Sequence, residues 1–170
     1  MIEDVLGAEA GRDLDRVELQ RLVSTIAADR RRWEPLVCFD TAERHFEQLW
    51  RDKHVDVWVI TWVSGNDTGF HDHDTSNGAV AVVEGEVIEE RLALGAAPRR
   101  VTHRAGETFD FDASHVHRML KDAAGRAVTI HAYSPPLWRM GSYAVTPDGE
   151  LRRRSISYVE ELRPAEADAA

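Results

Sequence analysis

The chain has 170 residues, 43% of them hydrophobic and 30% charged, and its formal net charge is −9. This length and composition predict one globular domain with a sizeable core and exclude a largely disordered chain. The acidic balance argues against a nucleic-acid partner, whose phosphates require clustered Lys and Arg. No stretch approaches the roughly 20 apolar residues that cross a membrane.

The N-terminal segment and the cysteine content indicate the compartment. Residues 1–15 are acidic and contain no basic stretch followed by an apolar one, so no signal peptide is predicted. Cys38 is the single cysteine, which excludes an intrachain disulfide and suits a reducing compartment. We therefore expect a cytoplasmic protein whose metal ligands, if it binds a metal, are histidines or carboxylates.

Residues 13–32 have the pattern of an amphipathic helix. The apolar side chains that recur at i, i+3, i+4 and i+7 are Leu19, Leu22, Val23 and Ile26. Asp13 or Asp15 is expected to cap the start of this helix. We expect the helix to form an N-terminal arm that packs against the outside of the main body.

From about residue 55 the sequence changes to short runs rich in Val, Ile, Thr and aromatic residues, separated by Gly, Asn and Asp. The predicted strands span residues 55–63, 78–84, 86–93, 107–111, 115–120, 127–133 and 153–158. The two strands on either side of Gly85 are expected to form a hairpin. Strands at this spacing predict an all-β sandwich or barrel, and a small jelly roll closes the sheet edges. We expect one domain with a helical arm at 1–40, a barrel at 41–163 and a disordered tail at 164–170.

Histidines are concentrated in two groups. His71 and His73 form the first group, and His115, His117 and His131 form the second. On a strand, a His-x-His pair places both imidazoles on the same face, so that both can reach one metal ion. The two groups together therefore predict a metal site.

Glycine spacing indicates which histidines are the ligands. The first motif of the cupin barrels has glycines at fixed intervals around its histidine pair, and this chain matches them with Gly65, Gly78 and Gly85. Counting from Gly106 selects His117, rather than His115, as the histidine of the second motif. We therefore predict a metal site formed by His71, His73 and His117.

The first motif usually has a glutamate where this chain has Gly78. Three neutral imidazoles leave a divalent ion its full +2 charge, which favours an anionic ligand such as a thiolate. Three protein ligands on one side also leave positions open for a substrate and O₂. Hydrolysis by zinc remains an alternative, because three histidines can also hold a zinc ion that ionises water.

A polar ladder lies within residues 127–136. Strand alternation places Thr129, His131 and Tyr133 on one face and apolar residues on the other. We interpret the three side chains as a relay in which Thr129 orients His131. In this interpretation His131 positions the Tyr133 hydroxyl to donate a hydrogen bond to substrate or dioxygen.

The chain resembles the cysteine dioxygenase family of thiol dioxygenases over roughly residues 45–137. The residues that carry the resemblance are Trp62, Phe70-His71-Asp72-His73, Ser76, Gly85, Glu89, His117-Arg118 and Thr129-Ile130-His131-Ala132-Tyr133-Ser134-Pro135-Pro136. The resemblance implies an all-β cupin jelly-roll barrel with N-terminal helices. It also implies that O₂ adds both of its atoms to the sulfur of a small thiol, giving a sulfinate.

The resemblance assigns roles to the residues already singled out. It implies Fe(II) held by the three histidines, and an outer triad of Tyr133, His131 and Thr129. In the animal enzymes a cysteine is joined covalently to the active-site tyrosine, but here that position is Gly78, so no Cys–Tyr crosslink is expected. Tyr133, Gln48 and Trp62 are the expected substrate contacts.

The substrate is the least defined part of this prediction. Enzymes of the family that act on cysteine hold its carboxylate with an arginine, and the corresponding region here contains Glu47 and Gln48, with Arg44 and Arg51 close by. Cysteine is the leading candidate, followed by 3-mercaptopropionate, mercaptosuccinate and an ergothioneine-type thiol, and Glu47 would suit a cationic substrate. The rival functions are a zinc or manganese cupin hydrolase or isomerase and a ligand-sensing cupin. We expect a monomer or a small homo-oligomer.

Overall fold

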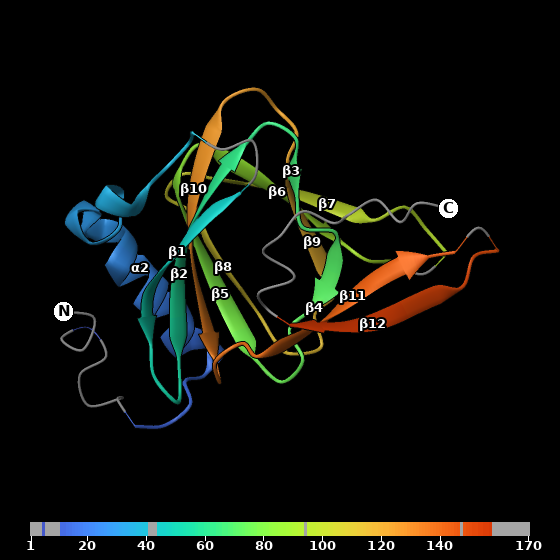
Figure 1. The fold of residues 1–170 in the computed structure, drawn as a ribbon, viewed down its shortest axis with the longest axis horizontal. Helices are drawn as coiled ribbons and strands as arrows, with labels where there is room; N and C mark the ends of the chain where they lie inside the picture. The colour runs from blue at the N-terminus through green and yellow to red at the C-terminus, as the bar shows by residue number, and fades with distance from the viewer. Residues whose placement is uncertain (1–4, 6–10, 41–43, 94, 147, 158–170) are drawn as a thin grey trace.

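The computed structural model describes residues 5, 11–40, 44–93, 95–146 and 148–157. Two antiparallel sheets pack face to face, and one helix covers the outer face of the first sheet (Figure 1). This arrangement confirms the expected all-β jelly roll with a helical N-terminal region. The tail expected to be disordered, 164–170, lies outside the described residues. Within the described residues, no helix has the length and apolarity that crossing a membrane requires.

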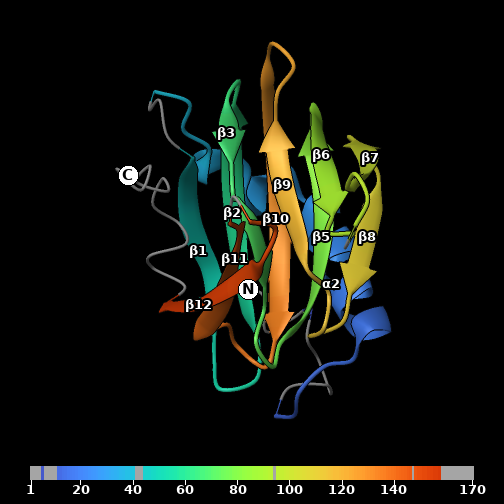
Figure 2. The same cartoon turned by 90° about the vertical axis from the view of Figure 1, so that its right-hand side faces the viewer.

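The chain passes between the two sheets several times, so each sheet combines strands that are distant in sequence. The first sheet has the order β1-β2-β10-β5-β8, with bounds β1 His45–Arg51, β2 Asp56–Val63, β10 Arg126–Ser134, β5 Asn77–Glu84 and β8 Thr108–Phe111. The second sheet, which faces the viewer in Figure 2, has the order β12-β11-β4-β9-β6-β7 with β3 also paired to β9. Its bounds are β12 Leu151–Ser157, β11 Arg139–Val145, β4 Phe70–Asp72, β9 His117–Lys121, β6 Glu86–Arg91, β7 Arg99–Arg104 and β3 Asn66–Asp67.

The helix, α2 (Arg16–Ala28), begins at a capping box. The Asp15 side chain accepts a hydrogen bond from the Glu18 backbone nitrogen at 2.9 Å, and the Glu18 carboxylate accepts one from the Asp15 backbone nitrogen at 2.8 Å. Of the two predicted caps, therefore, Asp15 is the one that forms. The helix ends earlier than predicted, and two 3₁₀ turns follow it, η2 (Arg30–Arg32) and η3 (Glu34–Leu36).

The central strands of the first sheet, β2, β10 and β5, are buried on both faces. The outer face of the sheet packs against the apolar side of α2 in one core cluster, to which β10 contributes Val128, Ile130 and Ala132. The alternate residues of the same strand therefore face the second sheet, across the interior of the barrel. The polar ladder thus points into the barrel because the apolar residues between its members pack against the helix.

The expected hairpin at Gly85 is wrong. β5 pairs with β10 and β8 in the first sheet, whereas β6 pairs with β7 and β9 in the second. Gly85 is therefore the point at which the chain passes from one sheet to the other. Its φ is 68°, and a Cβ on it would lie 2.1 Å from the backbone oxygen of Arg126. Only glycine fits this close crossing.

Five strands were not predicted: β1, β3, β4, β7 and β11. β3 and β4 are too short to show a pattern, and β7 is mostly charged. β1 and β11 are partly exposed, so their side chains do not alternate cleanly between apolar and polar. Backbone pairing with neighbouring strands, rather than side-chain pattern, makes these segments extended.

We expect Gly85→Ala to lower the free energy of unfolding by about 3 kcal/mol, because the added methyl group meets backbone at a strained, left-handed φ. Gly106→Ala is the matched control, since its φ is +91° and no described atom lies within 4 Å of the added methyl group. The control should lose only about 1 kcal/mol of backbone strain. Urea unfolding of both variants measures the difference, and equal losses would contradict the close crossing at Gly85.

Candidate metal centre

Three imidazoles meet inside the barrel on adjacent strands of the second sheet. His71 lies on β4 and His117 begins β9, and the two residues are paired in register. His73 follows the end of β4. All three are buried, and one ring nitrogen from each lies within 4.8 Å of those of the others. The structure thus brings together the three histidines that the glycine spacing selected.

His73 shows what the centre requires. Its side chain is fully buried, and neither ring nitrogen has a hydrogen-bond partner among the described residues. The ring packs against two aromatic rings, with centroid distances of 4.4 Å to Phe111 and 5.5 Å to Tyr133. Burial holds the pKa of His73 well below its usual value, so the ring is neutral. A metal ion at one ring nitrogen would satisfy this otherwise orphaned group, so the residues present fit a metal.

Hydrogen bonds assign the tautomers of the other two rings. His71 Nδ1 lies 3.0 Å from the Gly69 carbonyl oxygen, and His117 Nδ1 lies 3.0 Å from a carboxylate oxygen of Glu89. Both partners are acceptors, so Nδ1 carries the proton in each ring, and in the neutral form of the ring Nε2 then has the lone pair. This is the orientation of metal-binding histidines, whose remote nitrogen donates to a carbonyl or a carboxylate.

Glu89 is the buried carboxylate behind His117. It accepts further hydrogen bonds from His103 Nε2 at 3.3 Å and from His115 Nε2 at 2.7 Å, and it pairs with Arg91 at 3.0 Å. Burial alone would raise the pKa of Glu89, but the bonds from the three histidines hold it well below the usual range. In the sequence Glu89 was only part of the resemblance. Its role depends on histidines that are distant along the chain.

A second group of possible ligands consists of Glu89, His115 and His117. In this group the carboxylate already accepts hydrogen bonds from both imidazoles. The group therefore satisfies its own polar atoms, whereas His73 does not. For this reason His71, His73 and His117 are the better candidate for a metal centre, with Glu89 as the support for His117.

The polar ladder of β10 forms one continuous hydrogen-bonded chain. Trp62 Nε1 donates to Thr129 Oγ1 at 2.8 Å, Thr129 Oγ1 lies 2.8 Å from His131 Nε2, and His131 Nδ1 lies 3.0 Å from the Tyr133 hydroxyl oxygen. Burial lowers the pKa of His131 to about 3, so this ring is neutral, with one donor and one acceptor. When Thr129 donates to Nε2, Nδ1–H donates to Tyr133. The hydrogen of the Tyr133 hydroxyl can then be directed into the cavity.

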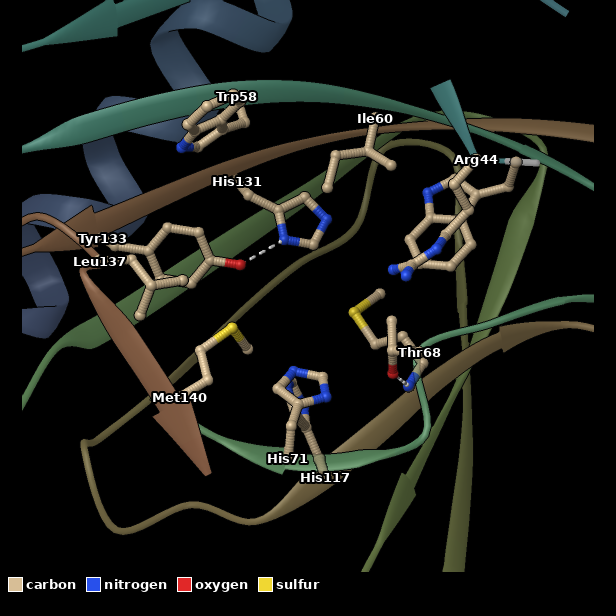
Figure 3. A pocket seen from close by; sticks show the side chains of 12 residues that line it. Arg44, Trp58, Ile60, Thr68, His71, His117, His131, Tyr133, Leu137 and Met140 are labelled. Atoms are coloured by element: carbon tan, nitrogen blue, oxygen red, sulfur yellow. Dashed lines mark hydrogen bonds between the residues drawn. The ribbon is translucent and has the colours of Figure 1, made fainter. Parts of the chain in front are cut away.

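A cavity of about 470 Å³, including the solvent at its mouth, lies between the ladder and the histidines. Tyr133 and His131 are on one side, His71 and His117 are on the opposite side, and Arg44 is at one end (Figure 3). The remaining lining residues are Trp58, Ile60, Trp62, Thr68, Met119, Leu137 and Met140.

The expected substrate contacts are only partly in place. Trp62 and Tyr133 line the cavity, but Gln48 does not, because it lies on the edge strand β1 with its side chain exposed. Glu47 is exposed on the same strand, so it offers no inward charge for a cationic substrate. Arg44, which sequence alternation could not place, is buried and lines the cavity, with its guanidinium carbon 5.5 Å from the Trp62 ring.

Comparisons with known proteins agree with this geometry. A family model described as cysteine dioxygenase type I matches residues 2–145. A protein from Thermus thermophilus superposes with a TM-score of 0.54 and 14% identity, covering 61% of this chain and 93% of its own. A protein with a double-stranded β-helix domain from Klebsiella pneumoniae superposes with a TM-score of 0.52 and 13% identity, and the match covers 71% of this chain and 91% of its own. For a cupin superfamily protein from Desulfitobacterium hafniense, the TM-score is 0.52 and the identity is 10%, and the match covers 61% of this chain and 87% of its own. At these identities the structures show the fold alone, which is that of the cupin barrels.

We expect His117→Ala to abolish tight binding of Fe(II) or Co(II), because it removes one of three ligands. His115→Ala is the matched control, since it removes only a hydrogen-bond partner of Glu89 and should retain tight binding. Calorimetric titration of the metal-free variants measures both affinities. Loss of tight binding in both variants would mean that the second group holds the ion, and tight binding retained in His117→Ala would contradict both groups.

The buried ladder predicts acid sensitivity. The pKa of His131 falls from 6.5 to about 3 on folding, so its contribution to stability is complete above pH 6.5 and is lost as the pH falls toward 3. Between pH 7.5 and 5.0 the loss should be about 2 kcal/mol. Urea unfolding at both pH values should show that His131→Gln loses about 2 kcal/mol less than the wild type. Equal losses in the two proteins would contradict a neutral, buried His131.

Proposed function

The chain belongs to the cysteine dioxygenase type I family, and from this premise and the geometry of the centre we propose that it is an Fe(II)-dependent thiol dioxygenase. The observation that carries the proposal is the orphaned His73 imidazole, which lies within a set of three histidines and faces a ladder that ends in a hydroxyl. Bound iron would supply a redox-active centre that brings a thiolate and O₂ together, and the product is a sulfinate. The single cysteine, Cys38, is free, which fits a cytoplasmic role in sulfur metabolism.

In this proposal the residues of the chain divide the work between the two sides of the cavity. His71, His73 and His117 hold the ion with neutral nitrogens, so the charge of the ion is left to be balanced by the substrate. On the opposite side, Thr129 and His131 fix the Tyr133 hydroxyl, which supplies a positioned proton or hydrogen bond. All three side chains of the ladder, Thr129, His131 and Tyr133, are buried, so none of them is exposed to bulk solvent.

The environment of Tyr133 also bears on the expected lack of a crosslink. Gly78 on β5 is paired with Tyr133 in register. A Cβ on Gly78 would lie 2.3 Å from the Phe111 ring, so this ring occupies the space that a side chain at the position would need. We therefore propose that Tyr133 acts as an unmodified tyrosine.

The cavity indicates the class of thiol. Arg44 is the charged side chain among the described lining residues, and the cavity has no acidic one. A carboxylate beside Arg44 would form charge-assisted hydrogen bonds, whereas an ammonium group would find no carboxylate partner there. We propose a small thiol carboxylate as the substrate. Cysteine and 3-mercaptopropionate both qualify, and the lack of a lining acid favours 3-mercaptopropionate.

The test is to load the protein with Fe(II) without oxygen, add thiols, and follow O₂ uptake together with sulfinate formation by mass spectrometry. The panel contains cysteine, 3-mercaptopropionate, mercaptosuccinate and 2-mercaptoethanol, the last having no carboxylate. Sulfinate formation from the carboxylates, and slower formation from 2-mercaptoethanol, is the expected result. No O₂ uptake with any thiol, or turnover of another compound without O₂ in a zinc- or manganese-loaded protein, would overturn the proposal.

Arg44→Met is expected to raise KM for 3-mercaptopropionate about 10- to 100-fold, because hydrogen bonds to a charged group contribute about 1.5–3 kcal/mol. The KM for 2-mercaptoethanol should not change, since that thiol has no carboxylate to lose a partner. An equal effect on both thiols would show that Arg44 acts on the shape of the cavity rather than on the charge of the substrate.

A further inference from the structure

Asp72 separates two of the metal-binding residues, His71 and His73, and its side chain points to the opposite face of the strand. Its carboxylate is buried and accepts five hydrogen bonds. The donors are the backbone nitrogens of Asp74 at 3.0 Å and Gly141 at 2.8 Å, the Tyr143 hydroxyl at 2.7 Å, and Arg153 through Nε at 2.7 Å and Nη2 at 3.0 Å. All except the first come from the β11–β12 hairpin, far along the chain.

Arg153 binds this carboxylate with two parallel hydrogen bonds, the fork geometry that suits a guanidinium. The residue beneath it is adapted to the pair. A Cβ on Gly141 would lie 2.3 Å from Arg153 Nε and 2.5 Å from Asp72 Oδ2, so only a glycine lets the two side chains meet over β11. Tyr143, opposite Arg153 in the β11–β12 register, completes the set.

The strand that carries His71 depends on this contact. β4 has three residues and pairs with β9 at a single position, His71 with His117. Its other partner is β11, along Phe70–Asp72. The hairpin therefore supplies most of the interactions that hold β4. Next to Gly141, Met140 of the same hairpin lines the cavity.

We infer that Arg153 is a positioning residue for the metal centre, because its bidentate pair with Asp72 fixes the backbone between His71 and His73. Most ion pairs at a protein surface contribute little to stability, and the Arg153 side chain of this pair is 40% exposed. The Asp72 side chain is only 10% exposed, however, and each of its oxygens has several donors. The pair thus acts on a buried group whose neighbours must point at one ion. The inference rests on the proposed metal centre but not on thiol chemistry.

The experiment compares Arg153→Met and Arg153→Lys with Arg152→Met, whose side chain is 72% exposed on the same strand. Co(II) titration of the metal-free proteins, followed by the visible d–d bands, measures affinity and ligand geometry. Loss of a partner behind a ligand typically weakens metal affinity about 10- to 100-fold. We expect that loss for Arg153→Met, a smaller one for Arg153→Lys, which keeps the charge but not the fork, and none for Arg152→Met.

Unfolding of the same proteins without metal separates positioning from stability. If Arg153→Met lowers the unfolding midpoint but leaves the Co(II) affinity and spectrum unchanged, the residue is merely structural and the inference is overturned. Should Arg153→Met fail to fold, Arg153→Lys and Tyr143→Phe carry the test, and unchanged Co(II) binding in both overturns it. If the wild type binds Co(II) but oxidises no thiol when it is loaded with Fe(II), the proposed function alone is contradicted. If it binds no Co(II), both the proposed function and the role of Arg153 are overturned.

Discussion

The candidate centre of this protein consists of three buried imidazoles in the interior of a barrel, with one ring nitrogen of each within 4.8 Å of those of the others. Burying such groups is costly unless each finds a partner, and His73 has none among the described residues. Much of the fold can be understood as the means of keeping them there. Two paired strands present the ligands, the opposite sheet closes the space above them, and α2 covers the outer face of that sheet. Because the helix takes the apolar residues of β10, the residues between them are left to line the interior with polar groups.

Each ligand strand is supported from behind by a buried carboxylate. The Asp72 side chain lies on the outer face of β4, and Glu89 accepts a hydrogen bond from His117 on β9. Asp72 is paired with Arg153, and Glu89 is paired with Arg91. Negative charge is thus placed around the centre but not in the ligand set. A carboxylate that accepts the Nδ1–H of an imidazole fixes the ring and increases its basicity, while an ion bound by the three histidines would keep its full charge for an incoming anion. The arrangement therefore combines ligands that are held rigidly with a side open to the cavity, where a bound ion would attract an anion.

The placement of side chains is predictable from the sequence where local geometry sets it. A period of two places Thr129, His131 and Tyr133 on one face whatever the rest of the chain does, and the structure shows them hydrogen-bonded along β10. The choice of His117 as a metal ligand, made from glycine intervals, stays a prediction. The errors arise where long-range pairing decides. A glycine at positive φ serves a hairpin or a crossing between sheets equally well, so Gly85 alone could not distinguish them. Arg44 rather than Gln48 enters the cavity because the middle of the edge strand β1 is exposed, and Arg153 is 81 residues from the aspartate it binds.

Charge balance connects the centre with its substrate. The ladder is neutral, the lining contains no acid among the described residues, and Arg44 adds a positive charge at one end of a cavity whose other wall would hold a divalent ion. A thiolate that also carries a carboxylate brings two negative charges to two positive positions. The thiolate of cysteine brings the same two charges together with an ammonium group, which would have to lose its proton or remain unpaired in a largely apolar space. For the proposed function, the electrostatics of the cavity therefore favour a thiol carboxylate without an amine, and the enclosing side chains Met119, Met140 and Leu137 suit the hydrocarbon that joins its two ends.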